Sequence, residues 1–267
     1  MIDIHNHIIF RFDDGPKTLN ESLDMLRMAG DQGITDVFAT SHFNEMIPME
    51  TEEDYFNKLA LLREEADKNN IDTRLHSGSE MFYHHFMDKT VVSSRVTTLA
   101  DQKQYILMEF PMFLMPTGVE DTVFKLTMDD YIPIIAHPER YSVIIEKPEK
   151  IVLFIRYGGL LQVNAGSILG DFGRRVQKIA INLVEKKMVH FIASDAHSTK
   201  GRAFKLKQAY EFMEQYVDKG YLKELVVSNP LAILKRERLK NVALPDLELD
   251  NEPSGFLSRV ERRFKLG

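Results

Sequence analysis

The sequence predicts an α/β fold in which a parallel sheet curls into a distorted or incomplete (β/α)7 barrel. Short runs of β-forming residues alternate with helical patterns about every thirty residues, which is typical of βαβ units. Several of these runs are almost wholly apolar, as expected for strands that are covered on both faces. The length of 267 residues is normal for one barrel of this class.

Seven runs carry the strand signal, and the first of them is the apolar start of the chain. Seven strands in place of eight is the reason to expect a distorted or incomplete barrel. The predicted strands cover residues 1–4, 34–40, 73–78, 105–110, 132–136, 160–164 and 190–194.

Helical patterns fill most of the segments between these strands. A last helix is expected after Asn229-Pro230, because proline is favoured at an early helical position. The other predicted helices cover residues 19–32, 52–68, 117–129, 148–157, 173–187 and 202–218.

The chain changes character near residue 244. We therefore predict one barrel domain over residues 1–244 and a polar, basic tail over residues 245–267, which packs on the barrel or is partly disordered. Four basic residues near its end could instead approach a membrane surface, although a solvated tail is favoured: Arg259, Arg262, Arg263 and Lys265.

Composition excludes several classes of protein. The chain has no cysteine, so disulfides, a cysteine zinc site and a cysteine nucleophile are all ruled out. The formal charge of −6 argues against general nucleic-acid binding, which needs a basic face. No uninterrupted apolar run approaches the roughly 18 residues of a membrane span. Since a strand-like segment starts the chain and leaves no room for a signal peptide, a cytoplasmic location is expected.

Histidines and carboxylates recur near the ends of six predicted strands. His5 and His7 are two residues apart, so a strand would direct both to the same side. In a parallel barrel the carboxyl ends of the strands gather at one rim, and the side chains that follow them should therefore converge. The nine candidate ligands are His5, His7, Asp14, His42, Glu80, Glu109, His137, Asp195 and His197.

Each candidate alone has a structural explanation. A single histidine beside a strand is often only hydrogen-bonded, and a single carboxylate after a strand is often a helix cap. Glu109 is less easily explained, because it interrupts an apolar run where an unpaired carboxylate is costly. The joint pattern predicts metal binding. Of the other histidines, His76 and His190 are expected to be structural. His84 and His85 follow in a loop and could contact substrate, although a surface position is favoured.

Nine ligands exceed one tetrahedral site and suit two or three ions with bridging carboxylates. Nitrogen and oxygen donors without sulfur favour manganese, iron or zinc. Clustered divalent ions commonly hydrolyse phosphate esters with a hydroxide nucleophile and no covalent enzyme intermediate. Arg140 and Arg202 lie in loops of the same rim and could bind phosphate oxygens, although each could also be a solvated charge.

Five motifs together resemble the polymerase-and-histidinol-phosphatase (PHP) superfamily of metal-dependent phosphoesterases, whose order of His-x-His, His, Glu, His and Asp-x-His is matched over residues 5–197. They are Met-Ile-Asp-Ile-His-Asn-His, Ser-Gly-Ser-Glu, Met-Glu-Phe-Pro, Ile-Ala-His-Pro-Glu-Arg and Ala-Ser-Asp-Ala-His. They are most similar to the manganese-dependent protein-tyrosine phosphatases of Gram-positive bacteria. The resemblance implies a distorted, TIM-like (β/α)7 barrel with three Mn²⁺ ions.

The resemblance also implies how the ligands are divided among the ions. One ion is expected at His5, His7, Glu80 and Asp195, a second at Glu80, Glu109 and His137, and a third at Asp14, His42 and His197. Arg140 and Arg202 correspond to the phosphate-binding arginines of the family.

The implied substrate is phosphotyrosine on a membrane-associated bacterial tyrosine kinase that controls capsular or extracellular polysaccharide synthesis. Two other functions stay open. One is a small-molecule phosphatase acting on a compound such as histidinol phosphate, and the other is a non-catalytic metal-binding regulatory module. The sequence leaves the oligomeric state undetermined.

Overall fold

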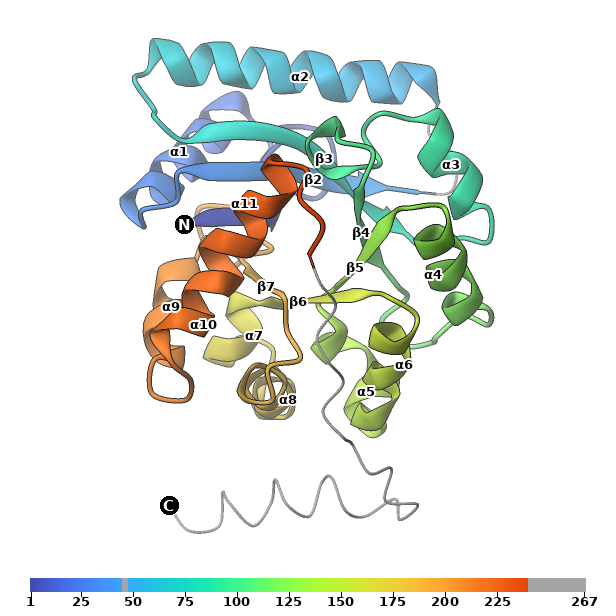
Figure 1. Ribbon diagram of the computed structural model, residues 1–267. Helices are drawn as coiled ribbons and strands as arrows, with labels where there is room; N and C mark the ends of the chain where they lie inside the picture. The colour runs from blue at the N-terminus through green and yellow to red at the C-terminus, as the bar shows by residue number, and fades with distance from the viewer. Residues whose placement is uncertain (45–47, 240–267) are drawn as a thin grey trace.

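The computed structural model describes residues 1–44 and 48–239, and its centre is one parallel sheet of seven strands in chain order. Figure 1 shows the strands curling into a barrel with helices outside. The predicted fold class is therefore confirmed. The strands are β1 Ile2–Asn6, β2 Asp36–Phe43, β3 Arg74–Phe82, β4 Tyr105–Glu109, β5 Ile132–Ala136, β6 Leu160–Asn164 and β7 Phe191–Ala193.

The barrel closes through backbone contacts between β1 and the end of β7. Asn6 forms an isolated parallel bridge with Ala196. The His7 amide donates to the Ala196 carbonyl at 2.8 Å, and the Asp195 amide donates to the His5 carbonyl at 2.8 Å. The first and last strands therefore meet at their carboxyl ends.

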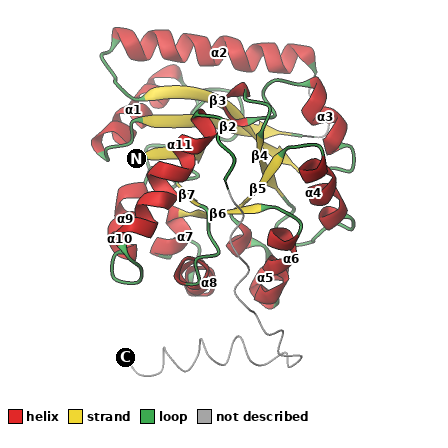
Figure 2. Cartoon of the chain, viewed as in Figure 1, coloured by secondary structure: helices red, strands yellow, loops and turns green. Residues whose placement is uncertain are grey.

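Helices cover the outside of the barrel, as Figure 2 shows. They bury one apolar core against the outer faces of the strands, while a second apolar cluster fills the interior with residues such as Ile4, Phe38 and Leu107. The longer helices are α1 Leu19–Asp31, α2 Met49–Lys68, α4 Val119–Met128, α8 Arg174–Glu185 and α9 Leu206–Met213. The shorter ones are α3 Met87–Ser93, α5 Ser142–Glu146, α6 Ile151–Arg156, α7 Ala165–Leu169, α10 Lys219–Lys223 and α11 Asn229–Leu234.

Two predicted strands were too short. β2 and β3 continue to Phe43 and Phe82 because their ladder runs on through polar residues, and His42 pairs directly with Glu80. Both side chains therefore belong to strands and not to the loops after them.

The helix predicted over residues 202–218 was wrong at both ends, since α9 covers only Leu206–Met213. A turn precedes it, in which the His197 and Ser198 amides donate to the Arg202 carbonyl. The segment predicted as a helix over residues 148–157 begins with a 3₁₀ turn, Pro148–Lys150, before α6. The expected helix after Asn229-Pro230 is present as α11.

β1 contains a change of register that its sequence does not predict. Asp3 pairs with Val37 and Asn6 with Ala39, so two residues of β1, Ile4 and His5, stand opposite the single residue Phe38. Such a bulge lets consecutive side chains turn to the same face. Ile4 packs in the barrel interior, and the His5 side chain turns toward Glu80.

Within the part of the chain that the structure describes, no helix combines the length and the apolar character needed to cross a membrane. The domain boundary predicted at residue 244 and the tail at 245–267 lie outside the described residues.

Glu139 joins two strand ends through a wholly buried carboxyl group. Its Oε1 accepts the Asn164 amide at 3.0 Å, which links the turn after β5 to the end of β6. Burial raises the pKa of Glu139 from 4.5 to about 7. The charged form is therefore disfavoured in the folded protein.

We predict that Glu139→Gln changes how the free energy of unfolding depends on pH. In the unfolded wild type this carboxyl ionises near pH 4.5, whereas the folded protein keeps the proton up to about pH 7. Glu139 should therefore contribute a loss of roughly 3 kcal/mol over this window, and the glutamine variant should lack this contribution. Urea titrations of chelator-treated protein at pH 4.5, 6 and 7.5 measure the difference. The exposed Glu211→Gln is the control, and parallel pH profiles for Glu139→Gln and wild type would contradict the assignment.

Candidate metal centre

The nine predicted ligands converge at the carboxyl ends of the strands. His5, His42, Glu80 and Glu109 lie in β1 to β4, and the remaining five lie in the segments that follow β1, β5 or β7: His7, Asp14, His137, Asp195 and His197. All but two of the nine side chains are buried, and the exceptions are Asp14 and His42, which reach the surface.

Glu80 is the centre of this arrangement and is only 1% exposed. Its carboxylate faces four imidazoles at hydrogen-bonding or ion-pair distance. The nitrogens are His5 Nε2 at 3.3 Å, His7 Nε2 at 3.3 Å, His42 Nδ1 at 3.1 Å and His137 Nε2 at 2.9 Å. Burial alone would raise the pKa of Glu80, but these imidazoles hold it well below its ordinary value.

Three overlapping groups of side chains bring ligand atoms within 4.8 Å of one another. Their members are His5, His7 and Glu80; His42, Glu80 and Glu109; and His7, Asp14, His42 and His197. Asp195 adds a carboxylate oxygen 3.6 Å from both His5 Nε2 and His7 Nε2.

The groups overlap with the expected three-ion division but do not reproduce it. In the second group His42 stands where His137 was expected, although His137 Nε2 lies 3.7 Å from Glu109. His7 and His42 each join two sets. The division of the ligands among three ions stays a prediction.

The donor set fits divalent cations. The Nε2 atoms of His5, His7 and His197 are buried and find no hydrogen bond of ordinary geometry among the described residues. They face carboxylate oxygens at 3.2–3.6 Å instead. A ligand set of carboxylates and imidazoles, with no sulfur, suits manganese, iron or zinc.

A second layer of acceptors fixes these imidazoles. His5 Nδ1 contacts Gln162 Oε1 at 2.9 Å, His7 Nδ1 contacts Asp13 Oδ2 at 2.8 Å, and His197 Nδ1 contacts the Asp195 carbonyl at 3.0 Å. In each contact an oxygen faces Nδ1, which favours a proton on that atom and makes Nε2 the atom that would bind a cation.

The Asp13-Asp14 pair shows what sequence reasoning missed. Asp13 is no candidate ligand: besides holding His7, it accepts the His42 amide at 3.1 Å and the Gly15 amide at 2.9 Å. Asp14 reaches His197 Nε2 at 3.2 Å. Adjacent aspartates look alike in the sequence, and only the direction of each side chain separates their roles.

Several side chains of the centre have raised pKa values, so they hold protons that a bound metal ion must displace. Burial would lower the pKa of His7, but the carboxylates of Asp13 and Glu80 raise it to about 10. Burial and the neighbouring Glu80 raise the pKa of Glu109 to about 7. Because cations bind the deprotonated ligands, protons and metal ions compete for this centre.

Arg140 and Arg202 both lie at the edge of the cluster and donate to Asp195. Arg140 Nη1 donates to Oδ2 at 3.0 Å, and Arg202 Nη2 donates to both oxygens at 2.7 Å. Their side chains are 18% and 37% exposed, so both guanidinium groups also face the rim. Phosphate binding by these arginines stays a prediction.

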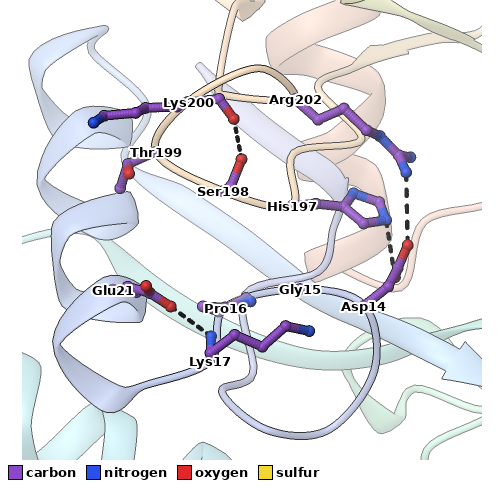
Figure 3. Close-up of a pocket in the computed structure, with 10 residues that line it drawn as sticks. All are labelled: Asp14, Gly15, Pro16, Lys17, Glu21, His197, Ser198, Thr199, Lys200 and Arg202. Carbon is purple, nitrogen blue, oxygen red and sulfur yellow. Dashed lines mark hydrogen bonds and ion pairs between the residues drawn. The ribbon is translucent and has the colours of Figure 1, made fainter.

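An open pocket of about 370 Å³ adjoins the cluster on the side of Arg202. Figure 3 shows His197 and Arg202 both directed at Asp14, with Lys17 below them. The Lys17 amide donates to the Glu21 carboxylate at 2.5 Å. The pocket leads from solvent to the predicted ligands Asp14 and His197.

The backbone is strained at two candidate ligands. His137 has φ of 32° and Asp195 has φ of 53°, in the left-handed region that side chains other than glycine seldom adopt. Both residues come directly after a strand or one residue later. The barrel keeps these conformations where they turn side chains toward the centre.

The remaining histidines lie outside the centre. His76 contacts Asp36 at 2.8 Å and His190 Nδ1 accepts the Leu161 amide at 3.1 Å, in agreement with structural roles. His85 is exposed as expected. The surface position predicted for His84 was wrong, because its side chain is buried beside Tyr83 in the segment before α3.

Comparisons with known proteins agree with the motifs. The family model for capsular polysaccharide synthesis proteins, CpsB/CapC, matches residues 1–235. A putative tyrosine-protein phosphatase, CapC of Staphylococcus aureus, is 34% identical over 238 residues, which is 86% of this chain and 92% of the relative. The tyrosine-protein phosphatase YwqE of Bacillus subtilis is 35% identical over 222 residues, covering 80% and 84%.

Solved structures extend the likeness to the fold. One similar crystal structure comes from work on YwqE from Bacillus subtilis and CpsB from Streptococcus pneumoniae, which are described as unique metal-dependent tyrosine phosphatases. It superposes with a TM-score of 0.83 and has 31% sequence identity, and the match covers 90% of this chain and 96% of that one. An organophosphorus hydrolase from Deinococcus radiodurans shares only the fold, with a TM-score of 0.56 and 10% identity over 87% of this chain and 92% of that one. The resemblance drawn from the motifs is confirmed, and the chain belongs to the CpsB/CapC family of capsular polysaccharide synthesis proteins.

Proposed function

We propose that this protein is a metal-dependent protein-tyrosine phosphatase. The observation that carries the proposal is the meeting of nine ligand-type side chains and two arginines at one rim of the barrel. Relatives that match over most of their length are named tyrosine-protein phosphatases. Nitrogen and oxygen ligands, guanidinium groups and an open pocket together suit a phosphoryl substrate.

Manganese is the proposed metal, in a cluster of three ions, with iron or zinc as alternatives. His5, His7, Glu80 and Asp195 would hold one ion. Glu80, Glu109 and His137 would hold a second ion. Asp14, His42 and His197 would hold the third. Divalent ions in such a site polarise phosphoryl oxygens and lower the pKa of bound water.

The chain itself contributes positioning and charge. Arg140 and Arg202 would grip phosphoryl oxygens through paired N–H groups and offset their negative charge. Asp13 and Gln162 hold two imidazoles in the orientation that presents Nε2. Because the chain has no cysteine, it has no thiolate to form a phosphocysteine, and we propose direct hydrolysis without a covalent intermediate.

The proposed substrate is phosphotyrosine carried by a protein. Asp14 is 58% exposed and His42 34% exposed, so this side of the centre is open to a side chain that projects from another protein. Membership of a capsular polysaccharide synthesis family supports a bacterial tyrosine kinase of that system as the partner. Such a kinase is membrane-associated, and this protein would then act on it from the cytoplasm.

We predict that Mn²⁺ raises the unfolding temperature of chelator-treated protein. Cations that bind only the folded centre stabilise it by about 2.7 kcal/mol at 100 times their dissociation constant, which is roughly 5–10 °C for a chain of this size. The shift should shrink as pH falls toward 5, because protons occupy the imidazoles. Differential scanning calorimetry with Mn²⁺, Zn²⁺ and Mg²⁺ measures it. An unfolding temperature that no metal changes would contradict a metal centre.

The function is tested by dephosphorylation of a phosphotyrosine peptide after metal removal and add-back. Wild-type protein should regain activity with Mn²⁺, while His5→Ala and Asp195→Ala should lose at least about 100-fold in kcat/KM, since each removes a ligand from a buried cluster. His76→Gln, which changes a histidine outside the centre, is the matched control. Circular dichroism and thermal unfolding establish that each variant is folded.

The outcomes separate the competing functions. A much higher kcat/KM for histidinol phosphate than for the peptide would indicate a small-molecule phosphatase. Metal binding without hydrolysis of either compound would indicate a regulatory module. Full activity in His5→Ala or Asp195→Ala would show that the ligands are wrongly assigned.

A further inference from the structure

Among the described strands, β6 is the one with no candidate ligand either within it or in the segment that follows, yet it directs two wholly buried amides at the centre. Gln162 Oε1 lies 2.9 Å from His5 Nδ1. Gln162 Nε2 donates to Asn164 Oδ1 at 2.8 Å, and Asn164 Nδ2 donates to Asp195 Oδ2 at 2.7 Å. We propose that Gln162 and Asn164 are positioning residues that form a directional hydrogen-bond relay, setting the ring proton of His5 and the orientation of Asp195 together.

The direction of the relay follows from donor and acceptor chemistry. The Asp195 carboxylate also receives both arginines, so it is ionised and can only accept. The nearest Asn164 atom must therefore be the NH₂ group, which turns Asn164 Oδ1 toward Gln162. Gln162 must then donate to that oxygen, and its own oxygen faces His5.

The last step decides the tautomer of His5. An amide oxygen accepts only, so His5 Nδ1 carries the proton and Nε2 carries the lone pair. That Nε2 is the atom that lies 3.3 Å from Glu80 and 3.6 Å from Asp195. A reversal of Asn164 would set its oxygen against the Asp195 carboxylate, and a reversal of Gln162 alone would set its oxygen against Asn164 Oδ1. Through the relay, the tautomer of His5 therefore depends on the Asp195 carboxylate, which lies just after β7.

The backbone holds the relay rigidly. Gln162 pairs with Phe191 and Asn164 with Ala193 in the ladder between β6 and β7. The Asn164 amide also donates to the buried Glu139 carboxyl group at 3.0 Å. Both amides are fully buried, so water does not compete for their hydrogen bonds. Functional side chains are placed most accurately when their supporting residues lie on such fixed strands.

The inference rests on the proposed metal centre, and its test is Mn²⁺ affinity measured by titration calorimetry. Gln162→Met removes both links at nearly constant volume and should weaken binding about 10- to 100-fold, the usual effect of losing such a support. Asn164→Leu, which leaves the Gln162 contact with His5, should weaken it less. Gln104→Met, the same change at a partly buried glutamine before β4, should leave it unaltered.

Gln162→Glu separates a relay from simple packing. At a pH where the new carboxyl group is ionised, it still accepts from His5 but has no proton for Asn164, whose amide must then turn its oxygen toward Asp195. We expect the Mn²⁺ affinity of Gln162→Glu to lie between that of Gln162→Met and that of the wild type. Equal losses in the two Gln162 variants would show that only the volume of this side chain matters and would overturn the relay.

The tautomer is read directly by long-range ¹H–¹⁵N spectra of histidine-labelled, zinc-loaded protein, with His5 assigned from the His5→Gln variant. A protected proton on His5 Nδ1 is expected in the wild type and should be lost or exchange rapidly in Gln162→Met. A proton on Nε2, or an unchanged Nδ1 signal in Gln162→Met, would refute the inference. Absence of metal binding by the wild type would instead refute the proposed function, so the two failures are distinct.

Discussion

The structure depends on holding three carboxylates together where little water reaches them. Glu80, Glu109 and Asp195 lie within one buried cluster, and their mutual repulsion would be costly without positive partners. Imidazoles surround Glu80, and two guanidinium groups contact Asp195. The same clustered carboxylates also attract divalent cations. The surrounding strands and loops must therefore place positive groups where they offset the charge of these carboxylates.

The barrel separates apolar packing in its interior from polar groups at the carboxyl ends of its strands. Apolar side chains such as Phe38, Leu107 and Ile134 fill the interior below the cluster and bury most of the strands. The carboxyl ends carry the polar groups, so the ligands lie on a support that apolar packing already stabilises. His137 and Asp195, two of the residues with positive φ, lie at the upper edge, where the adjoining ladders hold them.

The general position of the centre could be predicted from sequence because parallel strands end at a common rim. Any histidine or carboxylate near a strand end, such as His137, was a reasonable candidate once the βα period was recognised. The supporting residues could not be found in this way. Asp13 differs from Asp14 only in the direction of its side chain, and Gln162 lies inside a strand among apolar neighbours.

Strand lengths were limited by the same local reasoning. The strands predicted over residues 34–40 and 73–78 end before their last polar residues, whereas the backbone ladder continues through the pair His42 and Glu80. The pairing of two neighbouring strands compensates for polar side chains that neither strand would bury alone. Such compensation depends on partners distant in the chain, and a single sequence without a structure does not reveal it.

The bulge in β1 separates the motif from the arrangement it was taken to represent. His5 and His7 alternate in the sequence, and His5 reaches Glu80 from a register in which Ile4 and His5 together face Phe38. Deleting Ile4 would keep His-x-His intact while removing the bulge that lets Ile4 and His5 turn to the same face. Searches that recognise members of this family by the motif alone would then accept chains in which the first ligand is lost. The register of β1 is the better criterion, since it records whether the histidine can reach the cluster.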